Sequence, residues 1–308
     1  MVETTRSQLR AASFLDGRER FWSAEEVVDV DLSAHAPREE GRFIFHVGFC
    51  GSTLLARLLD QPGSVLSLKE PQSLADIASQ RGAILSGGAS GSVDPLIDHA
   101  LECLARARGP GEVVVIKPTN WVNSLLPWLC TPERSMRAVF VSMDPRAFLG
   151  AVFRGGRARL EFCTRLCAEV AQVVPNGQRR LVAAIDKGGN PLDQSARIAA
   201  LLHAMQEDLF DRAIAANGWS ADVRVYFSEL LARPDEVAQR VRSVLALAAR
   251  KARPASTARL MARHTKDPAG PFIPDQRRRE DAEIEELHGA RFDAALDWLN
   301  SFSGAASR

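Results

Sequence analysis

The chain has 308 residues, 46% of them hydrophobic and 25% charged, with 39 Lys and Arg against 38 Asp and Glu. This length can bury a sizeable core, and a formal net charge of +1 argues against a surface built as a whole for nucleic acid or membrane. No stretch approaches the roughly 18 apolar residues that span a bilayer, and the N-terminus lacks the apolar segment of a secretion signal. We therefore expect a cytoplasmic protein with no nucleic-acid partner and no membrane span. The five cysteines lack metal-ligand spacing, so we expect reduced thiols and no metal site.

Five short apolar runs have the length and composition of buried strands in a parallel sheet. They cover residues 42–47, 64–68, 112–117, 137–142 and 223–227. Helical periodicity appears between and after them, at residues 53–60, 73–81, 94–108, 120–129, 145 to about 173, 193–217 and 234–249. Alternation of this kind predicts βαβ units and an α/β fold.

The organisation that we expect is one large domain over residues 1–308, with a core at about 42–247. The long helical stretch at 145–217 reads as an insert, and the C-terminal segment 264–308 mixes basic, Pro-rich and helical pieces. Gly and Ser in residues 81–94 and the helix breakers in residues 173–193 indicate interrupting loops.

The segment RFIFHVGFCGSTLLARLLD, residues 42–60, has the pattern of a strand, a glycine turn and a helix. A strand ending at about Val47 and a helix beginning at Ser52 or Thr53 would aim free backbone N–H groups at one point, where an anion fits. Gly51 would let the backbone approach that ligand closely. The segment lacks the Lys of the nucleotide-triphosphatase loop G-x-x-x-x-G-K-[ST]. The alternative is an ordinary turn whose helix is capped by Ser or Thr.

This loop, Phe49-Cys50-Gly51-Ser52-Thr53-Leu54-Leu55, resembles R-S-G-T-T-L-L of the P-loop sulfotransferases, in the branch of bacterial and protein-tyrosine sulfotransferases. The resemblance continues in order through LLDQPGSVLSLKEP, VVVIKPTNW, AVFVSMDPRAFLGAVF and VRVYFSELLARPDEVAQRVRSVLAL, over about residues 42–247. It implies a P-loop NTPase-like three-layer fold with a central, mostly parallel sheet flanked by helices.

The resemblance also implies a function, the transfer of a sulfuryl group from 3′-phosphoadenosine 5′-phosphosulfate (PAPS) to a hydroxyl or amine of a small-molecule or peptide acceptor, without a metal. Glu70 falls at the family's catalytic base position, and Lys117 ends a strand where ligands bind in open α/β sheets. The residues expected to hold the donor are Gly48, Phe49, Cys50, Gly51, Ser52, Thr53 and Leu54, with Arg146 and Arg154.

Three positions depart from the family pattern. Phe49 replaces the loop's Lys or Arg, and Met143 and Ala151 replace the Arg and Ser that grip the 3′-phosphate. Substitute cations are available at Lys69, Lys117, Arg146, Arg154 and Arg157. The departures leave open a non-catalytic or altered-donor nucleotide- or anion-binding protein on the same fold. A kinase-like enzyme is disfavoured by the missing Lys and by the absence of a clear Mg²⁺-binding Asp after a strand.

Several of these residues also have purely structural interpretations. Glu70 would suit the first turn of the helix after Pro71, and Asn120 would cap the helix at Trp121. His46 reads as a core histidine, and Cys50 as a small residue rather than a reactive thiol. In the family the acidic residue at Glu229 is structural, and a basic segment resembling that around His264, Lys266 and residues 277–279 closes over the nucleotide in some members. A solvated tail is the alternative.

Overall fold

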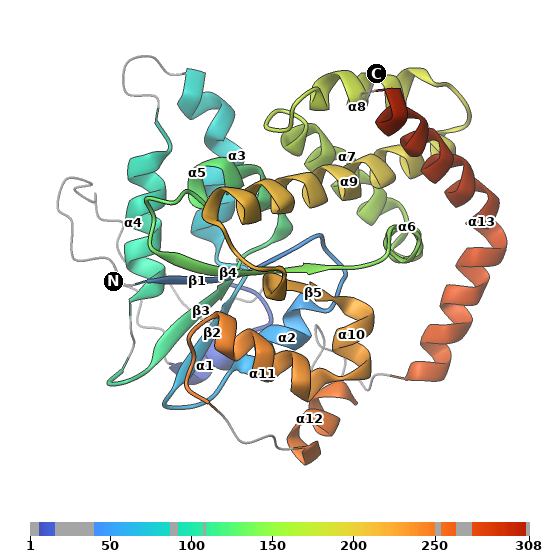
Figure 1. The fold of residues 1–308 in the computed structure, drawn as a ribbon. Coiled ribbons are helices and arrows are strands. Elements are labelled where there is room, and N and C mark those ends of the chain that lie inside the picture. The colour runs from blue at the N-terminus through green and yellow to red at the C-terminus, as the bar shows by residue number, and fades with distance from the viewer. Residues whose placement is uncertain are drawn as a thin grey trace. The chain divides into compact units, whose positions relative to one another are not determined.

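A five-stranded sheet forms the centre of the fold in the computed structural model, which describes residues 6–15, 40–86, 92–106, 109–249, 254–262 and 273–305. The strands are β1 (Gly41–His46), β2 (Val65–Lys69), β3 (Val113–Lys117), β4 (Met136–Ser142) and β5 (Arg224–Tyr226), in the spatial order β2-β3-β1-β4-β5. The pairs β1–β3, β1–β4 and β2–β3 run parallel (Figure 1). The predicted α/β fold with a parallel sheet flanked by helices is therefore confirmed.

The central strand β1 is buried on both faces. Phe43, Ile44 and Phe45 are fully buried in succession, which requires helices on both sides of the sheet. Phe45 stacks on Phe43 and on Phe140 of β4, with ring centroids 5.2 Å and 5.6 Å away. The continuous apolar run, rather than an alternating one, was the correct signal for this strand.

The described residues divide into two compact units, residues 1–141 with 213–272 and residues 142–212 with 273–308. The first unit holds the sheet. Figure 1 shows its helices α2 (Ser52–Leu59) and α11 (Pro234–Val244) on one face of the sheet, and α3 (Gln72–Ser86) and α5 (Leu126–Leu129) on the other. Its remaining helices are α1 (Arg6–Ala11), α4 (Asp94–Ala105), η1 (Asn120–Leu125), η2 (Ala221–Val223), α10 (Phe227–Ala232) and α12 (Pro254–Met261).

The second unit is helical. It contains α6 (Pro145–Arg154), α7 (Gly156–Val170), α8 (Gly177–Asp186), most of α9 (Pro191–Asn217) and α13 (Pro274–Ala305). One prediction was wrong here, because the helix expected over 145–173 breaks at Gly155, where Gly156 has a φ of 63°. The breakers at 173–193 do separate two longer helices, α7 and α9, and the short helix α8 lies between them.

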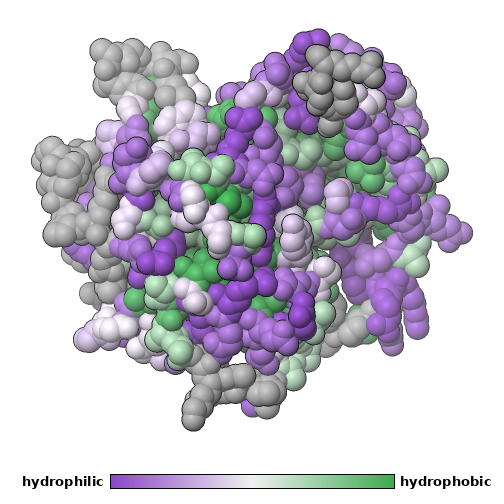
Figure 2. Space-filling view, viewed as in Figure 1, coloured by the Kyte–Doolittle hydropathy of each residue, from purple (hydrophilic) through white to green (hydrophobic). Residues whose placement is uncertain are grey.

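The C-terminal segment is more regular than predicted, because residues 274–305 form a single 32-residue helix, α13. Its buried residues Phe292, Ala295 and Trp298 recur at helical spacing, and Phe292 packs edge-on against Phe153 of α6 at 5.0 Å. The part of α13 that faces the viewer in Figure 2 is mostly hydrophilic. Within the described ranges, no helix is long and apolar enough to cross a membrane.

Candidate anion site at the carboxyl ends of β1, β2 and β3

The turn between β1 and α2 adopts left-handed backbone conformations at three positions. Gly48 has a φ of 99°, Phe49 of 57° and Gly51 of 76°. Left-handed conformations are readily available to glycine but cost energy for a bulky residue such as Phe49. The strand, glycine turn and helix predicted from the sequence are therefore present at this place.

Neighbouring side chains explain why both glycines are needed. A Cβ atom on Gly48 would lie 2.8 Å from Asn120 Nδ2, and one on Gly51 would lie 2.8 Å from the ring of Phe227. Any side chain at either position would displace the loop or its neighbours. Asn120 Nδ2 also donates to the carbonyl of Val47, at 3.1 Å.

The role found for Asn120 differs from the predicted one. Helix η1 begins at Asn120 itself, and its N-cap residue is Thr119. Asn120 instead fixes the carbonyl at the end of β1, and Asn123 does the same one residue earlier by donating to His46 O at 3.0 Å. Sequence reasoning missed Asn123, and the only signal for it is its spacing of three residues from Asn120, which places both on one side of a helical turn.

Helix α2 begins at Ser52, and its N-cap residue, Gly51, has no side chain that could cap the first turn. Ser52 and Thr53 are buried, with 5% and 3% exposure. The backbone N–H groups of such a turn carry partial positive charge and attract an anion. The turn thus has the chemistry of a phosphate- or sulfate-binding loop.

Cys50 and His46 are both buried and held by backbone carbonyls, while the role of Cys50 in donor binding stays a prediction. The Cys50 Sγ contacts Val141 O at 3.4 Å, and burial raises the pKa of this thiol to about 11, although the charge of Lys117 acts in the opposite direction. The neutral thiol is a poor nucleophile. His46 is 5% exposed and donates from Nε2 to Pro118 O at 3.0 Å.

A buried ion pair joins the ends of β2 and β3. Lys117 Nζ lies 2.5 Å from Glu70 Oε1, and the two side chains are 1% and 9% exposed. The backbone N–H of Glu70 donates to Lys117 O at 2.6 Å, and Glu70 has a φ of 56°. Because the charge of Lys117 acts on the Cys50 thiol, this pair belongs to the surroundings of the glycine turn.

Lys69 has a separate role. Its Nζ donates to the carbonyls of Leu9 and Arg10 at 3.4 Å and 3.1 Å, and to Ser67 O at 3.3 Å. Leu9 and Arg10 lie at the carboxyl end of α1, where a cation stabilises the helix. Among the substitute cations proposed from the sequence, Lys69 therefore serves α1, whereas Lys117 lies near the turn.

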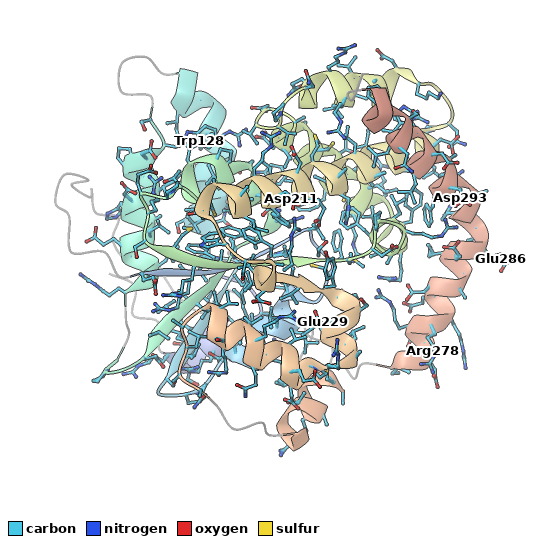
Figure 3. The ribbon with its side chains drawn as sticks, viewed as in Figure 1. Trp128, Asp211, Glu229, Arg278, Glu286 and Asp293 are labelled. Atoms are coloured by element: carbon cyan, nitrogen blue, oxygen red, sulfur yellow. The ribbon has the colours of Figure 1, made fainter. Side chains whose placement is uncertain are left out.

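The predicted arginines lie in the second unit. Arg146 pairs with Glu285 at 2.5 Å and with Asp293, which is labelled on α13 in Figure 3. Arg154 pairs with Asp281. Arg157, 92% exposed, pairs with Glu161. The roles of Arg146 and Arg154 in cofactor binding stay predictions.

The other motif residues are structural or undescribed. Glu229 on α10 (Figure 3) accepts two hydrogen bonds from Arg240, at 2.6 Å and 2.8 Å, and these lower the pKa of the Glu229 carboxyl. Glu229 thus joins α10 to Arg240 of α11. Met143 and Ala151 are buried, at 6% and 1% exposure. His264 and Lys266 lie outside the described residues.

Fold and turn together define an α/β protein with a P-loop-like arrangement, in which a glycine turn follows the central strand. No protein-family model matches the chain, and no curated protein matches it in sequence.

Proposed function

We propose that the protein is a sulfotransferase-like enzyme that moves a sulfuryl group from PAPS to a hydroxyl or amine acceptor. The observation that carries the proposal is the buried Lys117–Glu70 pair at the end of β3, the neighbour of the strand β1 that leads into the glycine turn. Strands β2 and β3 lie on one side of β1, and β4 and β5 lie on the other. Ligands of open α/β sheets bind at the carboxyl ends of strands where the chain changes direction in this way.

The residues present suit the phosphosulfate group. Backbone N–H groups from Gly51 to Thr53 would hold its oxygens, and the glycine turn admits a ligand close to the backbone. Phe49 brings no positive charge, so the transferring group needs a cation from elsewhere. Lys117 is a described cation whose charge acts on Cys50 of this turn, and a fixed charge in a site that excludes water stabilises a transition state by several kcal/mol.

The reaction uses both members of the ion pair. The acceptor oxygen or nitrogen forms a bond to sulfur, and the bond between sulfur and the bridging phosphate oxygen breaks. The acceptor's proton passes to Glu70, and the electron pair of the broken bond leaves with adenosine 3′,5′-bisphosphate. When Lys117 donates to a sulfuryl oxygen, its hold on Glu70 weakens, so the carboxylate becomes a better base at that moment.

A second candidate function is anion binding without catalysis. It is favoured by the contact of 2.5 Å between Glu70 and Lys117, since a carboxylate paired this closely is a weak base. In that case the turn holds a nucleotide or another anion, and no sulfuryl group moves.

A ligand panel followed by a turnover assay separates these functions. Thermal unfolding is measured with PAPS, adenosine 3′,5′-bisphosphate, sulfate, and ATP with Mg²⁺, since a ligand that binds only the folded state raises its stability. Release of adenosine 3′,5′-bisphosphate from PAPS is then followed with water as acceptor, which requires no knowledge of the natural one. We expect stabilisation by PAPS, and slow release that Glu70→Gln reduces by at least about 10²-fold without weakening donor binding.

Each of the other outcomes of the ligand panel favours a different conclusion. Stabilisation by PAPS without release would favour the binding protein. Stabilisation by ATP with Mg²⁺ alone would favour a kinase-like enzyme, and no stabilisation by any of the four would reject the proposal.

A further inference from the structure

A cavity of about 510 Å³ lies within the second unit, lined by the start of α6, the middle of α9 and the later part of α13. A volume of this size is typical of sites for small molecules. Most of its titratable lining is acidic, with one histidine among the carboxylates: Asp144, His203, Glu207, Asp208 and Asp211. The cavity thus combines enough space for a ligand with a strongly polar wall.

His203 presents a buried acceptor to this cavity. The residue is 5% exposed, and its Nε2 donates to Met143 O at 2.9 Å. A carbonyl oxygen can only accept, so this bond places the proton of the neutral imidazole on Nε2 and leaves Nδ1 with a lone pair. No donor among the described residues reaches Nδ1, and this atom is not sealed from solvent. Because the ring lines the cavity, Nδ1 can accept from a ligand there.

Asp144 adds an acceptor from the segment between β4 and α6. Its Oδ1 accepts from Ala147 N at 3.0 Å and thereby caps α6. Within the part of the chain that the structure describes, no group donates to its other carboxylate oxygen. The charges of Glu207 and Asp144 both act on His203. These three side chains therefore share one part of the cavity, although they come from two segments.

The remaining polar groups do not oppose a positive ligand. Glu207 and Asp211, which is labelled in Figure 3, follow His203 along α9 at intervals of four residues, which keeps all three on one side of the helix. Arg146 also lines the cavity, but Glu285 and Asp293 of α13 neutralise its guanidinium.

The wall contributed by α13 is apolar. Leu296 and Leu299 lie three residues apart on this helix, and both are half-buried. In the described ranges, no three His, Cys, Asp or Glu side chains are arranged so that they could hold a metal ion. Acceptors on one wall and aliphatic side chains on another suit an organic cation with an apolar body.

We propose that this cavity binds an aliphatic primary amine in its ammonium form. An ammonium group has three N–H donors and no acceptor, which matches the Nδ1 atom of His203 and the carboxylate of Asp144. The alkyl chain would pack on Leu296 and Leu299. The cavity includes neither the glycine turn nor the Lys117–Glu70 pair, so this inference goes beyond the proposed function and does not depend on it.

The test measures both affinity and the histidine ring in the full chain. Butylamine is titrated at about pH 8, where the amine is charged and the imidazole is neutral, with calorimetry for affinity and nitrogen NMR for the ring. Butan-1-ol has the same alkyl chain without the charge. We expect butylamine to bind and to shift the Nδ1 resonance of His203, which is assigned by its loss in His203→Gln. Butan-1-ol should bind at least about tenfold more weakly.

Two substitutions each remove one acceptor. His203→Gln keeps a donor for Met143 O but has no counterpart of Nδ1, so it should weaken butylamine binding by at least about tenfold. Asp144→Asn keeps the cap of α6, because Asn caps helices as well as Asp does, and should weaken binding by at least about threefold through the lost charge. Asp186→Asn is the matched control, since Asp186 is exposed at the end of α8 and does not line the cavity. It should leave the affinity unchanged.

Three results would overturn the proposal. The first is an unchanged Nδ1 resonance up to about 50 mM butylamine, and the second is equal affinity for butan-1-ol. The third is an equal loss of affinity in Asp144→Asn and Asp186→Asn, because the amine would then respond only to the general negative charge of this unit. If His203→Gln does not fold, the wild-type resonance and the comparison of Asp144→Asn with Asp186→Asn still decide the question.

Discussion

Lys117 and Glu70 are both withdrawn from water, so each depends on the other for neutralisation. Removing one partner of such a pair leaves an uncompensated buried charge, which typically costs 3–5 kcal/mol, whereas replacing both is often neutral. The pair therefore constrains the end of the sheet whatever ligand is bound.

We predict that Lys117→Met lowers the free energy of unfolding by about 3–5 kcal/mol, because Glu70 is then buried alone. The double variant Lys117→Met with Glu70→Gln should recover most of that loss. Urea unfolding followed by circular dichroism measures both. Lys187→Met, on an exposed residue at the end of α8, is the control, and an equally large loss there would contradict the assignment.

His203 gives the protein a sensitivity to acid. Its Nε2 donates to Met143 O at 2.9 Å, and it lines a cavity of about 510 Å³ with Asp144 and Glu207. Burial lowers the pKa of His203 below the ordinary value of 6.5, and the charges of Glu207 and Asp144 offset this only in part. The neutral imidazole is therefore the form that the folded protein keeps.

We predict that stability falls as pH drops below 6.5. In that range the unfolded chain protonates His203 while the folded protein does not, so the loss accumulates between 6.5 and the lower folded pKa, at a slope of at most about 1.4 kcal/mol per pH unit. His203→Gln keeps a donor for Met143 O but does not titrate. Its unfolding free energy between pH 7 and pH 5 should therefore change less than that of the wild type, and an identical slope would show that other groups dominate.

At the scale of secondary-structure elements, the glycine turn combines a left-handed backbone conformation with closely packed neighbouring side chains. Gly51 has a φ of 76° and Phe227 against its Cβ position, whereas Gly63 has nearly the same φ, 77°, and nothing within 4 Å. Substitutions at these two glycines therefore distinguish the cost of backbone strain from the cost of steric overlap.

We predict that Gly63→Val costs only the left-handed strain, about 1–2 kcal/mol. Gly51→Val should lose more, and it should abolish stabilisation by any anion that binds the turn, because the displaced backbone no longer presents its N–H groups. Thermal unfolding with and without PAPS or sulfate measures both effects. If Gly51→Val responds to ligand as the wild type does, the turn is not the binding site.

The secondary-structure elements also show how much of the fold could be predicted from the sequence. The end of β1 and the start of α2 follow from local signals, an apolar run and two glycines, and both lie within a residue or two of their predicted places. The break at Gly155 was missed because an apolar periodicity continues across it. The Lys117–Glu70 contact depends on β2 pairing with β3, with Lys69 opposite Lys117, and such pairing between distant segments leaves no local pattern.

For the molecule as a whole, the two compact units differ in how they depend on the C-terminal helix. Helix α13 belongs to the second unit and contributes buried Phe292, Ala295 and Trp298 to it. Its arrangement was not predictable from composition. The basic run at 277–279 suggested a solvated tail, whereas the ion pairs with α6 are made by the acidic Asp281, Glu285 and Asp293.

We predict that ending the chain at residue 272 destabilises the second unit selectively. Phe153 would lose its contact with Phe292, and Arg146 and Arg154 would lose their carboxylates. Hydrogen exchange should rise in residues 145–212 while β1, β3 and β4 stay protected. Removal of residues 306–308 alone is the control, and uniform exchange across both units would contradict the prediction.

The contacts of Asn120 and Phe227 with the two glycines have a further consequence for kinetics. A turn fixed by its neighbours before any ligand arrives loses little conformational entropy on binding, and association then needs no preceding rearrangement. The measured association rate should therefore be linear in ligand concentration, without the plateau that a slow opening step imposes.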